Sequence, residues 1–134
     1  MNRYVIDSTV FIALERGQIA HQDIAVRMAN SQYVVSAMTA SELLHGVEGS
    51  DTAVRRQKRL ELVEAVLDTV PIVSFDLNVA RIYARIWADL CRQGQEIGAH
   101  DTIIAATALS LDATVLTHNI RHFNRVDTLK VEAW

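Results

Sequence analysis

The chain has 134 residues, of which 50% are hydrophobic and 22% are charged, with five glycines and one proline. This length suits one domain spanning residues 1–134, and a chain with so many apolar residues is not intrinsically disordered. The formal net charge of −3 argues weakly against a nucleic-acid-binding protein, because such domains are usually basic.

The cysteine content and the hydropathy indicate the cellular compartment of the protein. Cys91 is the one cysteine, which excludes an intrachain disulfide and a thiolate metal site and is typical of a reducing compartment. The longest uncharged stretch, residues 28–41, is shorter than the roughly 20 apolar residues of a membrane-spanning helix. The first apolar run ends at Asp7, too early for a signal peptide. We therefore expect a soluble, cytoplasmic protein.

The N-terminal third alternates short apolar runs with helical patterns. The pattern predicts strands and helices at residues 4–6, 10–14, 24–28 and 33–35. We expect Ser8 or Thr9 to cap the first helix and Gly17 to end it. Thr39 followed three residues later by Glu42 matches the capping-box pattern, which places Glu42 in the first turn of a helix.

The remainder of the chain continues the alternation. The predicted elements are helices at 51–68, 77–93 and 102–111 and strands at 72–73, 114–117 and 129–131. Asp76 is expected to cap the second of these helices, whose Ala80, Tyr83, Trp87 and Leu90 share one face. Short apolar strands that alternate with helices indicate an α/β fold, with a parallel sheet between helical layers.

Four polar side chains are expected near the carboxyl ends of these strands, where parallel sheets bind ligands. Asp7 follows the first strand, Glu42 and Asp101 open helices, and Asn119 lies two residues past the fourth strand. Clustered carboxylates repel one another and need a countercharge. Oxygen ligands favour Mg²⁺ or Mn²⁺ over Zn²⁺, and such sites commonly hydrolyse phosphate esters. Taken singly, however, each acid could simply be a helix cap.

Four segments together resemble the PIN-domain nucleases, in the order and spacing of the VapC toxins of bacterial toxin–antitoxin pairs. They are YVIDSTV at residues 4–10, TASELLHG at 39–46, IGAHDTIIAATA at 97–108 and THNIRHF at 117–123. The third is the most specific, and the similarity extends over essentially the whole chain.

The resemblance implies more than the residues alone. It implies a PIN-like fold with a short parallel sheet, and an Mg²⁺- or Mn²⁺-dependent endoribonuclease that cuts RNA to inhibit translation. It also implies a cognate VapB-type antitoxin whose end inserts near the acidic site, and a homodimer. By position, Asp7, Glu42 and Asp101 match the metal-binding acids of the family. Asn119 stands where many members have a fourth acid, so one or two metal ions remain possible.

Other polar residues have both a functional and a structural interpretation. Ser8, Thr9 and Thr117 could orient the ligands or form ordinary caps, and the histidines near the site could donate a proton or lie at the surface. Those histidines are His100, His118 and His122. The candidate RNA contacts are Arg121 and Arg125, together with the run Arg55, Arg56, Lys58 and Arg59, for which a solvated helix face is the plainer interpretation. Tyr83 and Trp87 are expected in the core or at a dimer interface.

Two other functions are compatible with these residues. A phosphatase resembling haloacid dehalogenases would use Asp7 as a nucleophile, but that chemistry needs a second Asp where this chain has Thr9. A non-catalytic PIN-like module that only binds RNA or a partner is the other alternative, because Asn119 replaces an acid.

Overall fold

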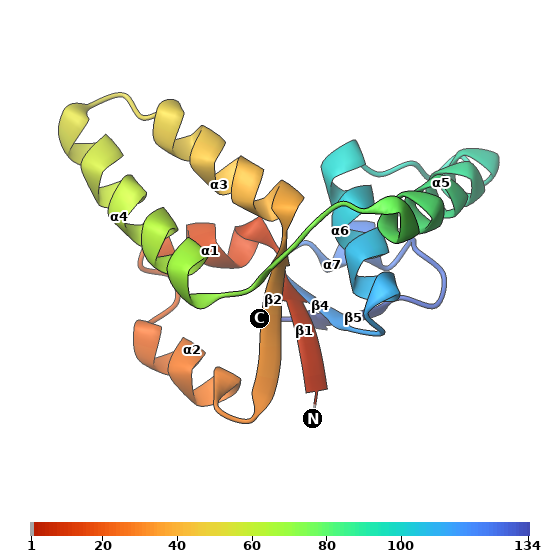
Figure 1. The fold of residues 1–134 in the computed structure, drawn as a ribbon, viewed down its shortest axis with the longest axis horizontal. Helices are drawn as coiled ribbons and strands as arrows, with labels where there is room; N and C mark the ends of the chain where they lie inside the picture. Colours follow the sequence, from red (N-terminus) through yellow and green to blue (C-terminus); the bar gives the residue numbers. More distant parts are fainter. Residues whose placement is uncertain (1) are drawn as a thin grey trace.

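The computed structural model describes residues 2–134, which form five strands and seven helices (Figure 1). The strands are β1 (Asn2–Ile6), β2 (Ser31–Ser36), β3 (Ile72–Val73), β4 (Thr114–Thr117) and β5 (Lys130–Ala133). The helices are α1 (Ser8–Glu15), α2 (His21–Met28), α3 (Ala37–Glu48), α4 (Ala53–Thr69), α5 (Leu77–Arg92), α6 (Ala99–Ser110) and α7 (Ile120–Phe123). The sequence pattern did not predict α7, whose four residues are too few for a periodic signal.

All the strands pair in parallel, in the order β3-β2-β1-β4-β5. Val5, the fourth residue of β1, pairs with Val34 of β2 on one side and with Val115 of β4 on the other. The chain therefore adds strands on one side of β1 and then reverses to the other side. Such a reversal opens a crevice at the carboxyl ends of β1 and β4, where ligands bind in open α/β sheets. The α/β prediction is confirmed.

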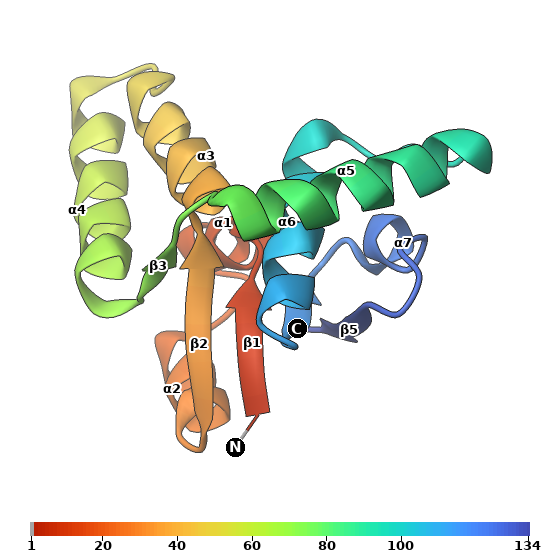
Figure 2. The same ribbon diagram turned by 45° about the vertical axis from the view of Figure 1, so that its right-hand side comes forward.

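Alternate side chains of β1 enter two different hydrophobic cores. Tyr4 and Ile6 pack in the core formed with α1, α2, α3 and α4, and Val5 packs in the core formed with α5, α6 and α7. In Figure 2, α5 and α6 lie in front of the sheet and α1 and α2 lie behind it. Within residues 2–134, no helix is long and apolar enough to cross a membrane.

The first helix begins one residue earlier than a Ser8 or Thr9 cap would allow, so that prediction is wrong. The cap is Asp7, whose Oδ1 accepts a hydrogen bond of 2.8 Å from the backbone N–H of Ser8. Asp7 keeps extended backbone angles, which lets the first residue after the strand serve as the helix cap. Gly17 follows the helix end with a φ of 71°, as predicted for a glycine at that place.

The capping box at Thr39 and Glu42 is also wrong. Ser36 at the end of β2 caps α3, and its Oγ accepts a hydrogen bond of 3.0 Å from the N–H of Thr39. The helix therefore starts at Ala37, and Glu42 lies in its second turn. The side chain of Thr39 is buried against Ser36 instead of facing solvent as a cap.

The face predicted for α5 is partly wrong. Asp76 caps this helix as expected, with its Oδ1 accepting a 2.9 Å hydrogen bond from the N–H of Val79. Val79, Ile86 and Leu90 point into the core, whereas Trp87 is 54% exposed. Since successive helical residues differ by about 100° in direction, the neighbour of Ile86 must point elsewhere. Trp87 is therefore not a core residue.

Candidate functional site

The site lies at the carboxyl edge of the two central strands. Asp7 follows β1, Thr117 ends β4, and Asn119 is the residue before α7. Glu42 approaches from the second turn of α3, and Asp101 lies in the first turn of α6. The reversal of strand order thus gathers residues that are far apart in the sequence.

Asp7 is held by three hydrogen-bond donors. Its Oδ1 accepts from the N–H of Ser8, and its Oδ2 accepts from the hydroxyls of Thr9 and Thr117, each at 2.8 Å. Asp7 is 2% exposed and Thr117 is fully buried. Burial raises the pKa of Asp7, and the two threonine hydroxyls oppose that rise by hydrogen bonding to the carboxylate. An ionised carboxylate accepts hydrogen bonds and cannot donate them. The three donors around Asp7 are therefore arranged for its ionised form.

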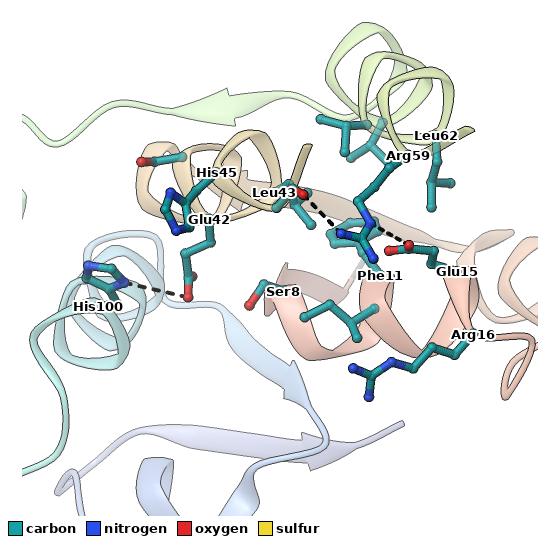
Figure 3. Close-up of a pocket in the computed structure, with 15 residues that line it drawn as sticks. Ser8, Phe11, Glu15, Arg16, Glu42, Leu43, His45, Arg59, Leu62 and His100 are labelled. Carbon is teal, nitrogen blue, oxygen red and sulfur yellow. Dashed lines mark hydrogen bonds and ion pairs between the residues drawn. The ribbon is translucent and has the colours of Figure 1, made fainter. Parts of the chain in front are cut away.

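Glu42 is held much less completely. Its Oε2 lies 3.6 Å from Nδ1 of His100, and its Oε1 is buried without a hydrogen-bond partner (Figure 3). The pKa of Glu42 is raised, first by burial and then by the negative charge of Asp7, while His100 lowers it. An unpartnered buried carboxylate oxygen is costly, so this atom needs a cation or a donor from another molecule.

Asp101 and Asn119 meet through His122. Nδ1 of His122 lies 3.1 Å from Oδ2 of Asp101 and 2.8 Å from Nδ2 of Asn119. The backbone N–H of Asn119 donates to the Thr117 hydroxyl, also at 2.8 Å. A continuous set of contacts therefore joins Asp101 on α6 to the threonine that holds Asp7.

The three acids lie within one another's electrostatic field. The charge of Asp101 raises the pKa of Asp7, and both charges raise the pKa of Glu42. Between residues 2 and 134, no group of three His, Cys, Asp or Glu side chains has the spacing of a metal site. The oxygen-only donors and the partnerless Oε1 of Glu42 nevertheless fit a hard divalent cation in their chemistry.

A groove that the sequence did not reveal leads away from Glu42. It has a volume of about 570 Å³ and runs between α1 and α3 to α4. Its walls are largely apolar, formed by Phe11, Ile12, Leu43, Leu62, Val63 and Val66. At the far end, Nε of Arg59 donates to Glu15 over 2.6 Å, and Nη1 of Arg59 donates to the carbonyl of Gly46 over 3.0 Å (Figure 3). The groove thus has an unsatisfied acid at one end and a paired acid at the other.

The arginine run on α4 has local partners. Arg55 pairs with Asp51 at 2.8 Å, and Arg56 pairs with Glu48 at 3.0 Å. Together with the pairing of Arg59, these contacts favour the solvated-face interpretation over a phosphate-binding patch.

The basic residues near Asn119 differ in their contacts. Arg121 is exposed, whereas Nη1 of Arg125 donates to the carbonyl of Glu96 over 3.1 Å. His118 is exposed, and its backbone N–H donates to the Thr9 hydroxyl over 3.1 Å. Arg121 and His118 are therefore more accessible to a ligand than Arg125.

Comparison with known proteins identifies the family of this chain. The PIN domain family matches residues 4–129. Ribonuclease VapC1 of Rickettsia felis is 35% identical over 127 residues, covering 95% of this chain and 92% of that protein. The tRNA(fMet)-specific endonuclease VapC of Salmonella typhimurium is 27% identical over 134 residues, covering 100% and 99%.

Solved structures of toxin–antitoxin complexes have the same fold. DNA-bound VapBC from Salmonella typhimurium matches with a TM-score of 0.88 and 26% identity, covering 100% of this chain and 99% of that one. VapBC-1 from nontypeable Haemophilus influenzae matches with a TM-score of 0.85 and 29% identity, covering 98% of both chains. The protein therefore belongs to the PIN-domain family and, within it, to the VapC ribonucleases.

Proposed function

We propose that this protein is the toxin of a type II toxin–antitoxin pair, an endoribonuclease that cuts RNA and thereby inhibits translation. The observation that carries the proposal is the approach of Asp7, Glu42 and Asp101 to one another at the carboxyl edge of the sheet, where the charge of Asp101 raises the pKa of Asp7 and both charges raise the pKa of Glu42. We further propose that residues 1–134 form one PIN domain, because the family match extends over residues 4–129.

The three acids would hold the metal ion. Nucleases of this family generally depend on a metal, and an all-oxygen donor set favours Mg²⁺ or Mn²⁺. Such an ion polarises the phosphoryl oxygen and lowers the pKa of a bound water. Asp7 would be the fixed ligand, since three donors orient its carboxylate, and Glu42 would supply its unpartnered Oε1. Asn119 would assist through its amide carbonyl, which brings no charge.

The partner would be a VapB-type antitoxin, as in the complexes with known structure. The groove that starts at Glu42 has apolar walls and an acidic end, so it fits an amphipathic segment with a basic residue. A homodimer is the second assembly we propose, supported by exposed Phe75, Leu77 and Trp87 at and before α5. The lone cysteine supports a cytoplasmic location.

The decisive experiment uses the protein separated from its antitoxin. We expect it to cut a mixture of cellular transfer, ribosomal and messenger RNA with Mg²⁺ or Mn²⁺, and EDTA to stop the reaction. Asp101→Ala should abolish cleavage, whereas Asp89→Ala, on the exposed side of α5, should not. Equal cleavage by Asp101→Ala and the parent would remove Asp101 from the site.

A non-catalytic module is the second candidate, favoured by Asn119 in place of an acid. It differs from the nuclease in one measurable property. Calorimetry with Mn²⁺ should show no tight divalent binding for a module that only binds RNA, whereas the nuclease should bind the ion.

A further inference from the structure

His122 contacts two of the four predicted site residues at once. It lies in α7, and its Nδ1 approaches Asn119 Nδ2 at 2.8 Å and Asp101 Oδ2 at 3.1 Å. Its side chain is 43% exposed, so the ring is partly buried against its neighbours and partly open to solvent. The ring therefore bridges the end of β4 and the start of α6.

The two contacts require opposite hydrogen-bonding roles of Nδ1. An amide nitrogen can only donate, so Nδ1 must accept from Asn119. An ionised carboxylate can only accept, so Nδ1 would have to donate to Asp101. A neutral imidazole does one of these at a time: with the proton on Nδ1 the ring donates to Asp101, and with the proton on Nε2 its Nδ1 accepts from Asn119.

The ring also completes a path between two acids. Asp7 Oδ2 accepts from the Thr117 hydroxyl, and that hydroxyl accepts from the backbone N–H of Asn119. The side chain of Asn119 contacts His122, which contacts Asp101. Among the residues that the structure describes, His122 is the hydrogen-bond partner found for the Asp101 carboxylate. Without the ring, Asp101 would be free to rotate toward solvent.

We propose that His122 is a positioning residue of the nuclease site, which holds the Asp101 carboxylate when Nδ1 carries the ring proton and the Asn119 amide when it does not, and so keeps these groups in the arrangement that a divalent ion requires. The inference rests on the proposed function and adds a residue to it. His122 acts through its two neighbours. Partners that orient ligating carboxylates typically change metal affinity or activity by about 10–100-fold when they are lost.

The test compares two substitutions of His122 with one of another histidine. His122→Phe keeps a planar ring and removes both nitrogens, while His122→Asn returns a polar group near the place of Nδ1. His21→Phe is the matched control, because His21 is exposed at the start of α2. The free protein is titrated with Mn²⁺ at one fixed pH, with bound ion followed by electron paramagnetic resonance, and RNA cleavage is measured as Mg²⁺ is increased.

We expect His122→Phe to weaken Mn²⁺ binding about 10-fold. The same variant should lower kcat at limiting Mg²⁺ with KM for RNA unchanged, and excess Mg²⁺ should restore the rate. His122→Asn should recover most of the affinity, His21→Phe should match the parent, and thermal unfolding midpoints should agree within a few degrees.

The outcome separates this inference from the proposed function. A parent protein that neither binds Mn²⁺ nor cuts RNA would overturn the proposed function itself. A parent that does both, together with His122→Phe of equal Mn²⁺ affinity, would overturn the positioning role alone. The role would also fail if His122→Asn were as weak as His122→Phe, since a polar group at Nδ1 would then not matter.

Discussion

Asp7 and Glu42 are predicted to bind the same ion, yet their surroundings are opposite. Asp7 accepts three hydrogen bonds and is 2% exposed, whereas one oxygen of Glu42 is buried with no partner. The difference follows from the elements that carry them. Asp7 lies between two paired strands and the first turn of a helix, where donors are close at hand. Glu42 projects from one helix across a groove.

The comparison shows that one site can contain a carboxylate that is already fixed and another whose hydrogen bonding is incomplete. A carboxylate with all its donors in place is fixed before any ligand arrives, because rotating it would break three hydrogen bonds. A carboxylate with an unpartnered oxygen is destabilised until a ligand arrives. Two carboxylates of one site therefore differ: hydrogen bonds offset part of the cost of burying Asp7, whereas one oxygen of Glu42 is buried with no such compensation.

The largest effect is expected at Asp7. Asp7→Asn removes the negative charge. It also replaces one acceptor oxygen by an NH₂ group, which cannot accept the hydrogen bonds that the neighbouring donors make to Asp7. We expect cleavage to fall more than about 100-fold, beyond the ~10–100-fold cost of losing an orienting partner. The free energy of unfolding should fall by about 1–3 kcal/mol, the cost of an unsatisfied buried group.

Asp68→Asn, on the exposed side of α4, is the control for Asp7→Asn and should behave like the parent in both assays. If Asp7→Asn were as stable as the parent in urea, the three donors would not be what fixes this carboxylate.

The next effect is expected at Thr117, which is fully buried. Thr117→Val keeps the shape but removes a donor to Asp7 and the acceptor of the Asn119 N–H. We expect a loss of about 1–3 kcal/mol in the free energy of unfolding and a ~10–100-fold loss of activity. Thr107→Val is a matched control: Thr107 is 1% exposed, but its hydroxyl bonds only to the Ile103 carbonyl of its own helix. If both variants lost equal amounts of stability and activity, the hydrogen bond from Thr117 to Asp7 would contribute no more than an ordinary buried hydroxyl contact.

The sequence predicted the residues at strand ends better than those on helices. Asp7 and Asn119 were placed at strand ends because the short, continuous apolar runs before them end sharply. Glu42 was placed in the first turn of its helix by a capping box that the structure does not contain, since Ser36 and not Thr39 caps α3. A capping pattern is local, and an adjacent strand end can override it.

Contacts across long stretches of chain were beyond prediction from one sequence. The groove depends on Arg59 reaching Glu15, 44 residues earlier. The role of His122 depends on how α7 packs against α6, and α7 itself was not predicted. Strand patterns specify which edge of a sheet is polar, but they do not specify how helices on one face approach one another.

A smaller effect of opposite sign is expected at Glu42. Glu42→Gln removes a buried charge that the Asp7 and Asp101 carboxylates repel. In EDTA at pH 7 we expect the variant to gain about 1 kcal/mol in the free energy of unfolding, since a partly buried amide costs less than a partly buried charge with one unpartnered oxygen. Cleavage should nevertheless be lost. A less stable Glu42→Gln variant would show that this acid is satisfied in the free protein.

The pH dependence should reveal the same effect. The pKa of Glu42 is raised above the ordinary value of 4.5, so its contribution to stability is fully present below that pH and is lost as the pH rises through the folded-state pKa. Stability measured in EDTA from pH 4 to pH 7 should therefore fall less in Glu42→Gln than in the parent. Parallel curves for the two proteins would mean that Glu42 titrates as it does in the unfolded chain.

The smallest effect is expected at the far end of the groove, where Glu15 is paired with Arg59 and both side chains are about one-third exposed. Glu15→Gln should cost about 0.5–1 kcal/mol at low salt and less at high salt, as for other partly exposed ion pairs. Glu64→Gln, an exposed acid on α4, is the control and should change nothing. If Glu15→Gln lowers the free energy of unfolding in urea and Glu42→Gln raises it, the groove contains one satisfied acid and one unsatisfied acid. If Glu15→Gln instead stabilised the protein, the negative charge of Glu15 would be unsatisfied as well, and both ends of the groove would be candidate cation sites.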